Sequence, residues 1–416
     1  MTKLFDFNDI PVVDTHVHTP LRWESEDNFL ALGERDYLRV TDQILPLDRE
    51  KGLRAKVLAE VREQSRSRPA ATSILHYYQD RYKLGYSDRP SVDRFVRDSI
   101  KKLGPAVYTL DVFKNEKIRW VLADQSFSPD ASKRETDAYP SAMTKWTFPL
   151  AGIIQPTWAL ERKMENLDEA VRAVKNMVRL TRKNGCSGFK SIQGYFRDFY
   201  LEDVDEGDAE RAYKLLKRAK PSTFITSPAK VPIYATKPLA TALRSYQDFA
   251  LKQAFSEAGK LQAPVLIHAA VGEVPQLKPW NNDPSGLYSI FDNSQIQRSN
   301  TQFVILHTGF PAHHVVTSII TQYPNVSVDL SWVSHASILT HSILFEYLTI
   351  APHQKVMHGS DGSHPDVIAF AARSTRKSLS LIAQWFKENY GWSETEVTAL
   401  AEAVLYKNAE RIFGTV

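Results

Sequence analysis

Eight short apolar segments constrain the fold of this chain more than any other feature of its sequence. Each is bounded by polar or turn-forming residues and is followed by a stretch with helical spacing. Strands that are apolar along their length and alternate with helices are typical of parallel sheets covered on both faces. Eight such units predict an α/β fold with a closed (β/α)8 barrel, the TIM-barrel architecture. The expected strands are Ile10–His16, Ile118–Ala123, Pro149–Gln155, Gly188–Ile192, Pro264–His268, Gln302–His307, Val326–Leu330 and Lys355–Gly359.

Capping signals mark the bounds of two expected helices. Asn166-Leu-Asp-Glu169 resembles a capping box, and Gly185 ends the segment that follows it. Ser393-Glu-Thr-Glu396 opens a final helix that we expect to run to about Phe413, before Gly414.

Two connections are longer than a barrel requires. Residues 18–118 span about 100 positions, where a loop and one helix need roughly 30. We therefore divide the chain into a barrel, residues 1–19 and 117–416, and a mostly helical insertion, residues 20–116. A second added segment is expected between Tyr195 and about Gln262. Both follow the carboxyl ends of strands, so we expect the first to cover the barrel mouth and help select the substrate.

Composition narrows the range of partners and compartments. The 416 residues carry a formal charge of only +4, and the basic residues are spread along the chain. Nucleic acid and membrane surfaces are therefore not expected partners, whereas a small-molecule substrate is, and a homo-oligomer is compatible with the sequence. The single cysteine, Cys186, excludes an internal disulfide and a cysteine-based zinc cluster. Without an apolar leader or a run of about 20 apolar residues, we expect a cytoplasmic protein.

Metal-ligating residue types recur where the expected strands end. Asp14-Thr-His16-Val-His18 places two imidazoles on the same side of an extended backbone. His268 and His307 end two later apolar strands, and Asp361 follows the last one. One such histidine is more often an ordinary rim residue, but five ligand residues at the ends of four of the expected strands indicate a metal site. Zinc, iron and manganese accept this donor set.

Lys190 lies within the fourth expected strand, Gly188–Ile192, where an unpaired ammonium is costly. One interpretation is a lysine that reaches the barrel rim or pairs with an acid. The other is a lysine carbamylated by CO₂, which would bridge two metal ions as a carboxylate. The sequence leaves both interpretations open.

Three residues are candidates for substrate binding. Arg22 follows the first strand and Arg197 follows the fourth, so either could hold a substrate carboxylate through two hydrogen bonds or form a rim salt bridge. His364 and His358 flank Asp361, and His364 is the better candidate for the pocket mouth.

The helix start at His313-His314 is expected to be solvated or to lie behind the ligands. The remaining histidines considered are expected at the surface: His335, His341 and His353.

These residues together resemble the amidohydrolase superfamily. The resemblance rests on segments from the first strand to the last: Asp14-Thr-His16-Val-His18, Phe189-Lys190-Ser-Ile, Ile267-His268, Leu306-His307-Thr-Gly and His358-Gly-Ser-Asp361-Gly. The closing Lys407-Asn-Ala-Glu-Arg-Ile-Phe-Gly414 resembles the amidohydrolase-related branch. Within that branch, the Lys190 segment resembles the subgroup found fused to glutamine synthetase, the nodulin type.

The resemblance implies a metal-dependent hydrolase that cleaves an amide or another C–N bond of a small polar substrate. A metal-activated water would attack the substrate, and Asp361 would act as the general base. The implied metal ligands are His16, His18, Lys190, His268, His307 and Asp361, around one or two ions, with zinc the first choice and manganese or iron the alternatives. Two other functions stay open: a metal-dependent decarboxylase of the same superfamily, and a barrel that binds without catalysing.

Overall fold

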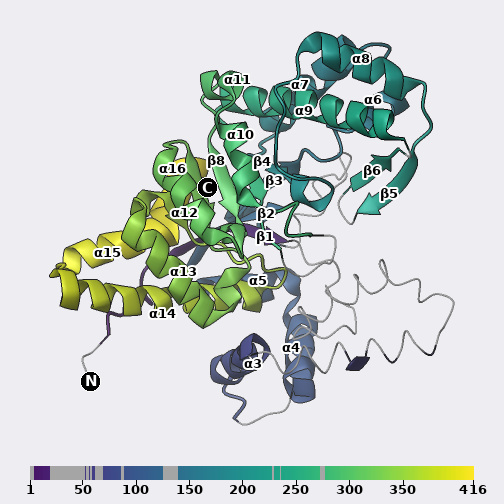
Figure 1. Ribbon diagram of the computed structural model, residues 1–416. Coiled ribbons are helices and arrows are strands. Elements are labelled where there is room, and N and C mark those ends of the chain that lie inside the picture. The colour runs from purple at the N-terminus through teal and green to yellow at the C-terminus, as the bar shows by residue number, and fades with distance from the viewer. Residues whose placement is uncertain are drawn as a thin grey trace.

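Eight parallel strands follow one another in a single sheet, in the order β1-β2-β3-β4-β7-β8-β9-β10 (Figure 1). The computed structural model describes residues 4–18, 52, 56, 59–60, 69–85, 89–124, 139–226, 229–234, 236–271 and 277–416. The strands are β1 (Val12–His18), β2 (Ile118–Asp124), β3 (Thr144–Pro149), β4 (Gly188–Ser191), β7 (Val265–His268), β8 (Phe303–Leu306), β9 (Val326–Asp329) and β10 (Val356–Met357).

The first and last strands meet and complete the barrel. The backbone N–H of Thr15 donates to the carbonyl of His358 at 3.2 Å, and that of Asp361 donates to the carbonyl of His16 at 2.8 Å. A parallel bridge joins Val17 to Gly362. The predicted (β/α)8 barrel is therefore confirmed.

Alternation along the strands divides their side chains between two apolar layers. Leu266 and Val304 belong to a buried cluster that includes Met357 and Phe413, whereas Val265 and Ile305 belong to the larger cluster shared with the surrounding helices. Because side chains alternate in a strand, the residue two positions after Leu266 lies on the barrel's inner side. That residue is His268.

The third strand corrects the sequence prediction. We expected it at 149–155, but β3 spans Thr144–Pro149, and residues 151–154 form a turn before a helix that starts at Pro156. The apolar run is buried because this turn packs inside the protein, with Leu150 and Ile153 fully buried. The real strand escaped detection because its first three residues, Thr144, Lys145 and Trp146, are only half-buried and lack an apolar pattern.

Helices surround the barrel and fill the connections between its strands. They are α3 (Pro69–Tyr82), α4 (Arg89–Leu103), α5 (Pro105–Asn115), α6 (Pro156–Glu161), α7 (Leu167–Lys183), α8 (Glu206–Lys217), α9 (Lys237–Lys260), α10 (Tyr288–Phe291), α11 (Ser294–Arg298), α12 (His313–Gln322), α13 (Ser337–Ile350), α14 (Pro365–Tyr390), α15 (Glu394–Glu402) and α16 (Asn408–Phe413). Among the helices of the described residues, none is both long and apolar enough to cross a membrane.

Both expected capping signals form. The Asn166 side chain accepts a hydrogen bond from the backbone N–H of Glu169 at 2.9 Å, and α7 ends just before Gly185. Ser393 and Glu396 make a reciprocal capping box at the start of α15. The final helical segment continues through a π-helical stretch, Ala403–Lys407, into α16 and ends at Gly414.

The long first connection contributes α3, α4 and α5 to the described residues. Helix α5 packs against β2 and α14, and α3 also contacts α14. Helix α5 therefore takes the place of the ordinary barrel helix between the first two strands. The division at residues 20–116, and the expected position of that insertion over the barrel mouth, remain predictions.

The second long connection forms a hairpin arm. Strands β5 (Ser222–Thr226) and β6 (Ala229–Ile233) pair antiparallel, and Figure 1 shows them apart from the barrel strands. The chain then enters α9, whose face toward α8 and α7 is buried. The added segment expected after Tyr195 is thus this hairpin together with α8.

A buried carboxylate links α14 to the first connection. Asp366 accepts hydrogen bonds from the phenols of Tyr82, at 2.9 Å, and Tyr108, at 2.5 Å. The Nε of Arg81 lies 3.5 Å from the same carboxylate. Burial nevertheless raises the pKa of Asp366 to about 6, which means that the folded protein holds this proton more tightly than the unfolded chain does.

This pKa predicts how stability changes with pH. Because the folded pKa is raised, the contribution of Asp366 is most favourable at about pH 4 and is lost as pH rises through about 6. The asparagine in Asp366→Asn does not titrate, so this variant lacks this loss of stability with rising pH. The free energy of unfolding of the variant minus that of the parent should therefore increase by about 1–3 kcal/mol between pH 4 and pH 7. Urea unfolding of both chelated proteins measures it. A difference that stays constant with pH would contradict the raised pKa.

Candidate metal centre

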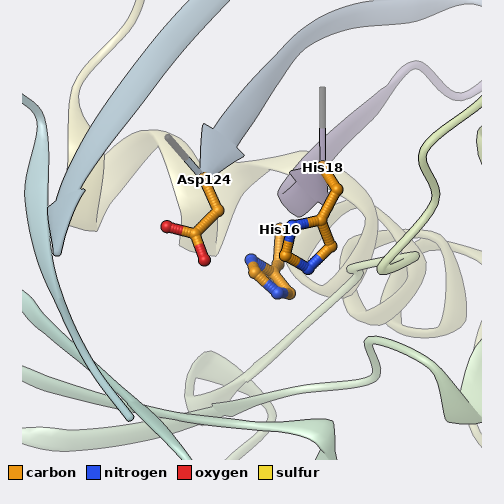
Figure 2. Close-up of side chains that lie close together, drawn as sticks. All are labelled: His16, His18 and Asp124. Carbon is orange, nitrogen blue, oxygen red and sulfur yellow. The ribbon is translucent and has the colours of Figure 1, made fainter. Parts of the chain in front are cut away.

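The two histidines of β1 form one side of the site. His16 and His18 are two residues apart, and their ring centroids are 4.9 Å apart. His16 is almost completely buried, whereas the His18 side chain is 41% exposed. Figure 2 shows both imidazoles next to the carboxylate of Asp124, which ends β2. The site therefore opens to solvent on the side of His18.

Asp361, which follows the last strand, β10, lies next to these histidines. Its Oδ1 lies 3.1 Å from Nε2 of His16 and 3.0 Å from Nε2 of His18, and its Oδ2 lies 3.8 Å from Nδ1 of His307. Burial raises the pKa of Asp361, but the surrounding imidazoles outweigh this and hold it well below its usual range. The carboxylate is thus ionised and is shared by histidines from two strands.

His268 and His307 complete the ring of imidazoles. Their centroids are 4.4 Å apart, and His307 lies 5.2 Å from His16. Burial lowers the pKa of His268 to about 3 and that of His307 well below its ordinary value. Both rings are therefore neutral at ordinary pH, which is the form that binds metals.

Asp124 belongs to the site although the sequence analysis did not select it. Its Oδ2 lies 3.4 Å from Nζ of Lys190, and Thr147 donates a hydrogen bond to its Oδ1 at 3.0 Å. Burial alone would raise the pKa of Asp124. Lys190 and the two β1 histidines lower it by more than burial raises it, so the pKa is below its usual value. The sequence signal was present, because Val121-Leu-Ala-Asp124 is an apolar strand that ends in an acid.

Lys190 lies inside the barrel at the centre of these groups. It pairs in register with Leu266, whose side chain belongs to the inner cluster. Its Nζ lies 3.1 Å from Nε2 of His16, in addition to the contact with Asp124. The structure therefore brings Lys190 into contact with two candidate ligands, and it contains the acid partner that one interpretation of the sequence required.

A second set of polar groups positions His307. Ser331 Oγ lies 2.9 Å from its Nδ1, and Asp329 Oδ1 accepts a hydrogen bond from its backbone N–H at 2.9 Å. Asp329 also accepts from the Thr15 hydroxyl at 3.1 Å. A Cβ on Gly359 would lie 2.6 Å from Asp329 Oδ2, so only glycine allows this approach. These residues were missed because nothing local marks a serine or an aspartate as a neighbour of a distant histidine.

Unusual backbone conformations gather at the ends of the last three strands. His307, Thr308, Trp332 and Asp361 all have φ between 59° and 63°, although none is glycine. Such conformations cost about 1–3 kcal/mol each and are concentrated at functional sites. Two of the four are candidate metal ligands, so the strain lies where the site needs fixed geometry.

The donor set fits a divalent cation. Two groups bring ligand atoms within 4.8 Å of one another: His16, His18 and Asp124, and His16, His307 and Asp361. Neutral imidazoles and ionised carboxylates are ligands for zinc, iron and manganese. Because His16 belongs to both groups, the residues can surround one ion, and a second ion would need another bridging group.

The candidate substrate residues occupy different places. Arg197 is buried in an ion pair with Asp248. His364 is buried at the N-cap of α14, where its Nδ1 accepts a hydrogen bond from the N–H of Asp366. Arg22 lies outside the described residues. The substrate roles of all three remain predictions.

Other histidines depart partly from expectation. His358 does not lie at the pocket mouth: it is fully buried, with Nδ1 3.0 Å from the Thr375 hydroxyl. His335 is only half-exposed, and burial lowers its pKa to about 4. Thr375 belongs to α14, so His358 faces a helix that covers the barrel, a placement that strand patterns do not encode. The helix expected at His313 does begin there, and the His314 side chain is 75% exposed.

Comparisons with known proteins agree with this architecture. Residues 230–415 match the family model described as amidohydrolase. Protein fluG of Emericella nidulans is 24% identical over 234 residues, which cover 54% of this chain but 25% of that protein. The chain thus spans about a quarter of the relative's length.

Two solved structures share the fold along nearly the whole chain. A protein described as a metal-dependent hydrolase, from Lactobacillus casei, is 18% identical with a TM-score of 0.70, and the match covers 98% of this chain and 96% of that one. A uronate isomerase from Thermotoga maritima is 14% identical with a TM-score of 0.68, over 98% and 95% of the two chains. The carboxyl-terminal part of the chain, residues 230–415, thus matches the amidohydrolase family model, and nearly the whole chain shares the barrel fold of these two structures.

Proposed function

We propose that the protein is a hydrolase that cleaves an amide or another C–N bond of a small polar substrate. The observation that carries this proposal is the position of Asp361. One ionised carboxylate lies within 3.1 Å of both β1 histidines and is still 17% exposed, so a water molecule and a substrate can reach it. An acid that must accept and return a proton needs this combination of fixed position and access.

The chain's own residues have distinct parts in this reaction. A bound divalent ion, with zinc our first choice, would polarise the substrate and lower the pKa of water. His16, His18, His268 and His307 would hold the metal, with Asp361 and, in the two-ion form, Lys190. Asp361 would take the proton of the attacking water and return it to the leaving nitrogen. Asp329 and Ser331 would keep His307 in its orientation through the hydrogen bonds described above.

A product assay tests this proposal directly. The purified protein, chelated and then reloaded with zinc, manganese or iron, is incubated with a panel of small amides, ureides and cyclic imides. Metal-dependent release of the amine is the expected result. Metal binding without turnover on any panel would favour the non-catalytic binding module and contradict the enzymatic proposal.

The second candidate is a reaction on a carboxylate substrate with a single ion. The contact between Lys190 and Asp124 favours it, because an ammonium that is paired with an acid requires no modification. Decarboxylation is one form of such a reaction, and isomerisation of a sugar acid, the activity named for the Thermotoga maritima relative, is another. CO₂ release or an isomerised uronate in the same assay would replace the hydrolase proposal.

A further inference from the structure

A cavity of about 520 Å³ lies beside the metal centre and is formed by segments added to the barrel. The 3-10 turn η5 (Gln193–Tyr195) and the residues after it form one wall, β6 and Tyr234 form another, and α9 forms a third. Apolar side chains such as Phe196 and Leu243 line much of it. Its cationic residues are Arg197, Arg244 and Lys278, and both arginines are ion-paired with neighbouring acids. This volume is in the range of small-molecule sites.

Tyr195 connects the cavity with the metal centre. It lines the cavity, and its ring centroid is 4.9 Å from that of His268. A molecule in the cavity therefore lies one aromatic side chain away from a candidate metal ligand. The cavity is placed to hold the part of a substrate that does not react.

Three hydrogen-bond donors of the cavity-lining residues are buried without a hydrogen-bond partner in the described part of the chain. They are Nη1 of Arg197, Nε of Arg244 and the phenol of Tyr234. Arg197 is 9% exposed and Tyr234 is 7% exposed, so solvent does not easily satisfy their donors, whereas the Arg244 side chain is 29% exposed. A buried donor without a partner is costly, and the two donors of Arg197 and Tyr234 in the lining of one cavity indicate a missing acceptor.

The neighbouring acids form no hydrogen bond to these three donors, although Nε of Arg244 lies within ion-pair distance of Glu202, at 3.8 Å, and of Asp248, at 3.9 Å. Asp248 pairs with Nη2 of Arg197, which also donates to the carbonyl of Tyr200 at 3.0 Å. Asp198 accepts from both Nη atoms of Arg244, at 3.1 and 2.6 Å. These contacts fix the two guanidinium planes and occupy their other atoms. What remains is a preorganised group of donors, of the kind that binds a carboxylate.

We propose that this cavity binds the carboxylate end of a substrate with an apolar or aromatic body. Nη1 of Arg197 and the phenol of Tyr234 hold the carboxylate, the apolar walls hold the body, and the reactive group reaches past Tyr195 toward the metal centre. The direction of the substrate rests on the proposed function, whereas the carboxylate site itself does not.

The test uses two probes of nearly equal shape with the full-length protein. Binding of 3-phenylpropanoate and of neutral 3-phenylpropanamide is measured by calorimetry on chelated protein, where no turnover occurs. We expect the carboxylate to bind at least about tenfold more tightly than the amide, because hydrogen bonds to a charged group are the strong ones. Tyr234→Phe should weaken carboxylate binding by about tenfold and leave amide binding nearly unchanged.

A matched variant controls for the loss of a buried phenol. Tyr246 also has a buried hydroxyl without a hydrogen-bond partner, but it does not line the cavity, so Tyr246→Phe should bind both probes like the parent. Leu243→Trp should fill the cavity and abolish binding of both probes. Equal affinity for the two probes, or carboxylate binding that survives both Tyr234→Phe and Leu243→Trp, would overturn the proposal. If the protein binds the carboxylate probe as expected but turns over no substrate of the amide panel, the carboxylate site is supported and only the proposed hydrolase function is contradicted.

Discussion

Asp361→Asn should lower kcat by about two or more powers of ten while the barrel stays folded. Asparagine has nearly the same shape as aspartate, but its amide cannot accept a proton from water. In the parent, Asp361 Oδ1 lies 3.1 and 3.0 Å from the imidazoles of His16 and His18, so the variant also removes the negative charge nearest to these two candidate ligands. The two effects act in the same direction on activity.

Measurements at saturating metal separate them. Metal affinity is determined first, and kcat is then compared at full occupancy, so that a lost base is distinguished from a lost ligand. Asp366→Asn is the control for the loss of a buried carboxylate on the same segment: the Asp366 side chain contacts Tyr82, Tyr108, Arg81 and His364, and none of these is a candidate metal ligand. An unchanged kcat in metal-saturated Asp361→Asn would assign the general base to another residue.

The barrel could be predicted because its strands are encoded locally. Strands buried on both faces are apolar along their length, so seven of the eight were found at the correct places within a few residues. The exception, β3, begins with the half-buried Thr144, Lys145 and Trp146, and its burial depends on neighbours that the local pattern does not reveal. The hairpin β5–β6 was expected only as an added segment, since its position is set by packing against distant helices.

The sequence predicts those residues of the candidate site whose side chains are of metal-ligating types and follow apolar strands. His16, His18, His268, His307 and Asp361 end apolar strands, and parallel strands bring such ends together. Asp329 and Ser331 could not be selected in this way, because their importance comes from contacts with His307 more than 20 residues away in the sequence. One wall of the cavity, β6 and Tyr234, comes from the hairpin arm, so the sequence offered Arg197 but not the pocket around it.

Charge balance makes Lys190 the residue that determines how many ions the centre can hold. The ionised carboxylates of Asp124 and Asp361 and one ammonium give the buried centre a net charge of −1. Two divalent ions would change this to +3, a large uncompensated charge for a buried site. Carbamylation converts the lysine from a cation to an anion and lowers the total to +1, the value that a single ion gives with an unmodified lysine. Two ions therefore require the modified lysine, and one ion does not.

If the hydrolase has two ions, Lys190→Ala should lose one metal equivalent of two, and kcat should fall by about two powers of ten. Lys190 Nζ lies 3.1 Å from Nε2 of His16, the ligand shared by both groups, so a carbamate there is placed to bridge ions roughly 3.5–4 Å apart. Metal content by mass spectrometry and kcat, measured beside the parent, test this. Protein prepared in ¹³C-labelled bicarbonate should also show a carbamate carbon by NMR that is absent from Lys190→Ala.

Lys190→Arg distinguishes the two forms of the centre, because arginine keeps a cation beside Asp124 but is not carbamylated in this way. In a two-ion centre it should behave like Lys190→Ala. In a one-ion centre it should retain the metal and recover part of the activity, since the ion pair with Asp124 is preserved. A parent with one tightly bound ion, no carbamate carbon and a Lys190→Ala variant that keeps its metal would contradict the two-ion form. Lys190 would then be a cation paired with Asp124, and the single-ion decarboxylase would become the stronger candidate.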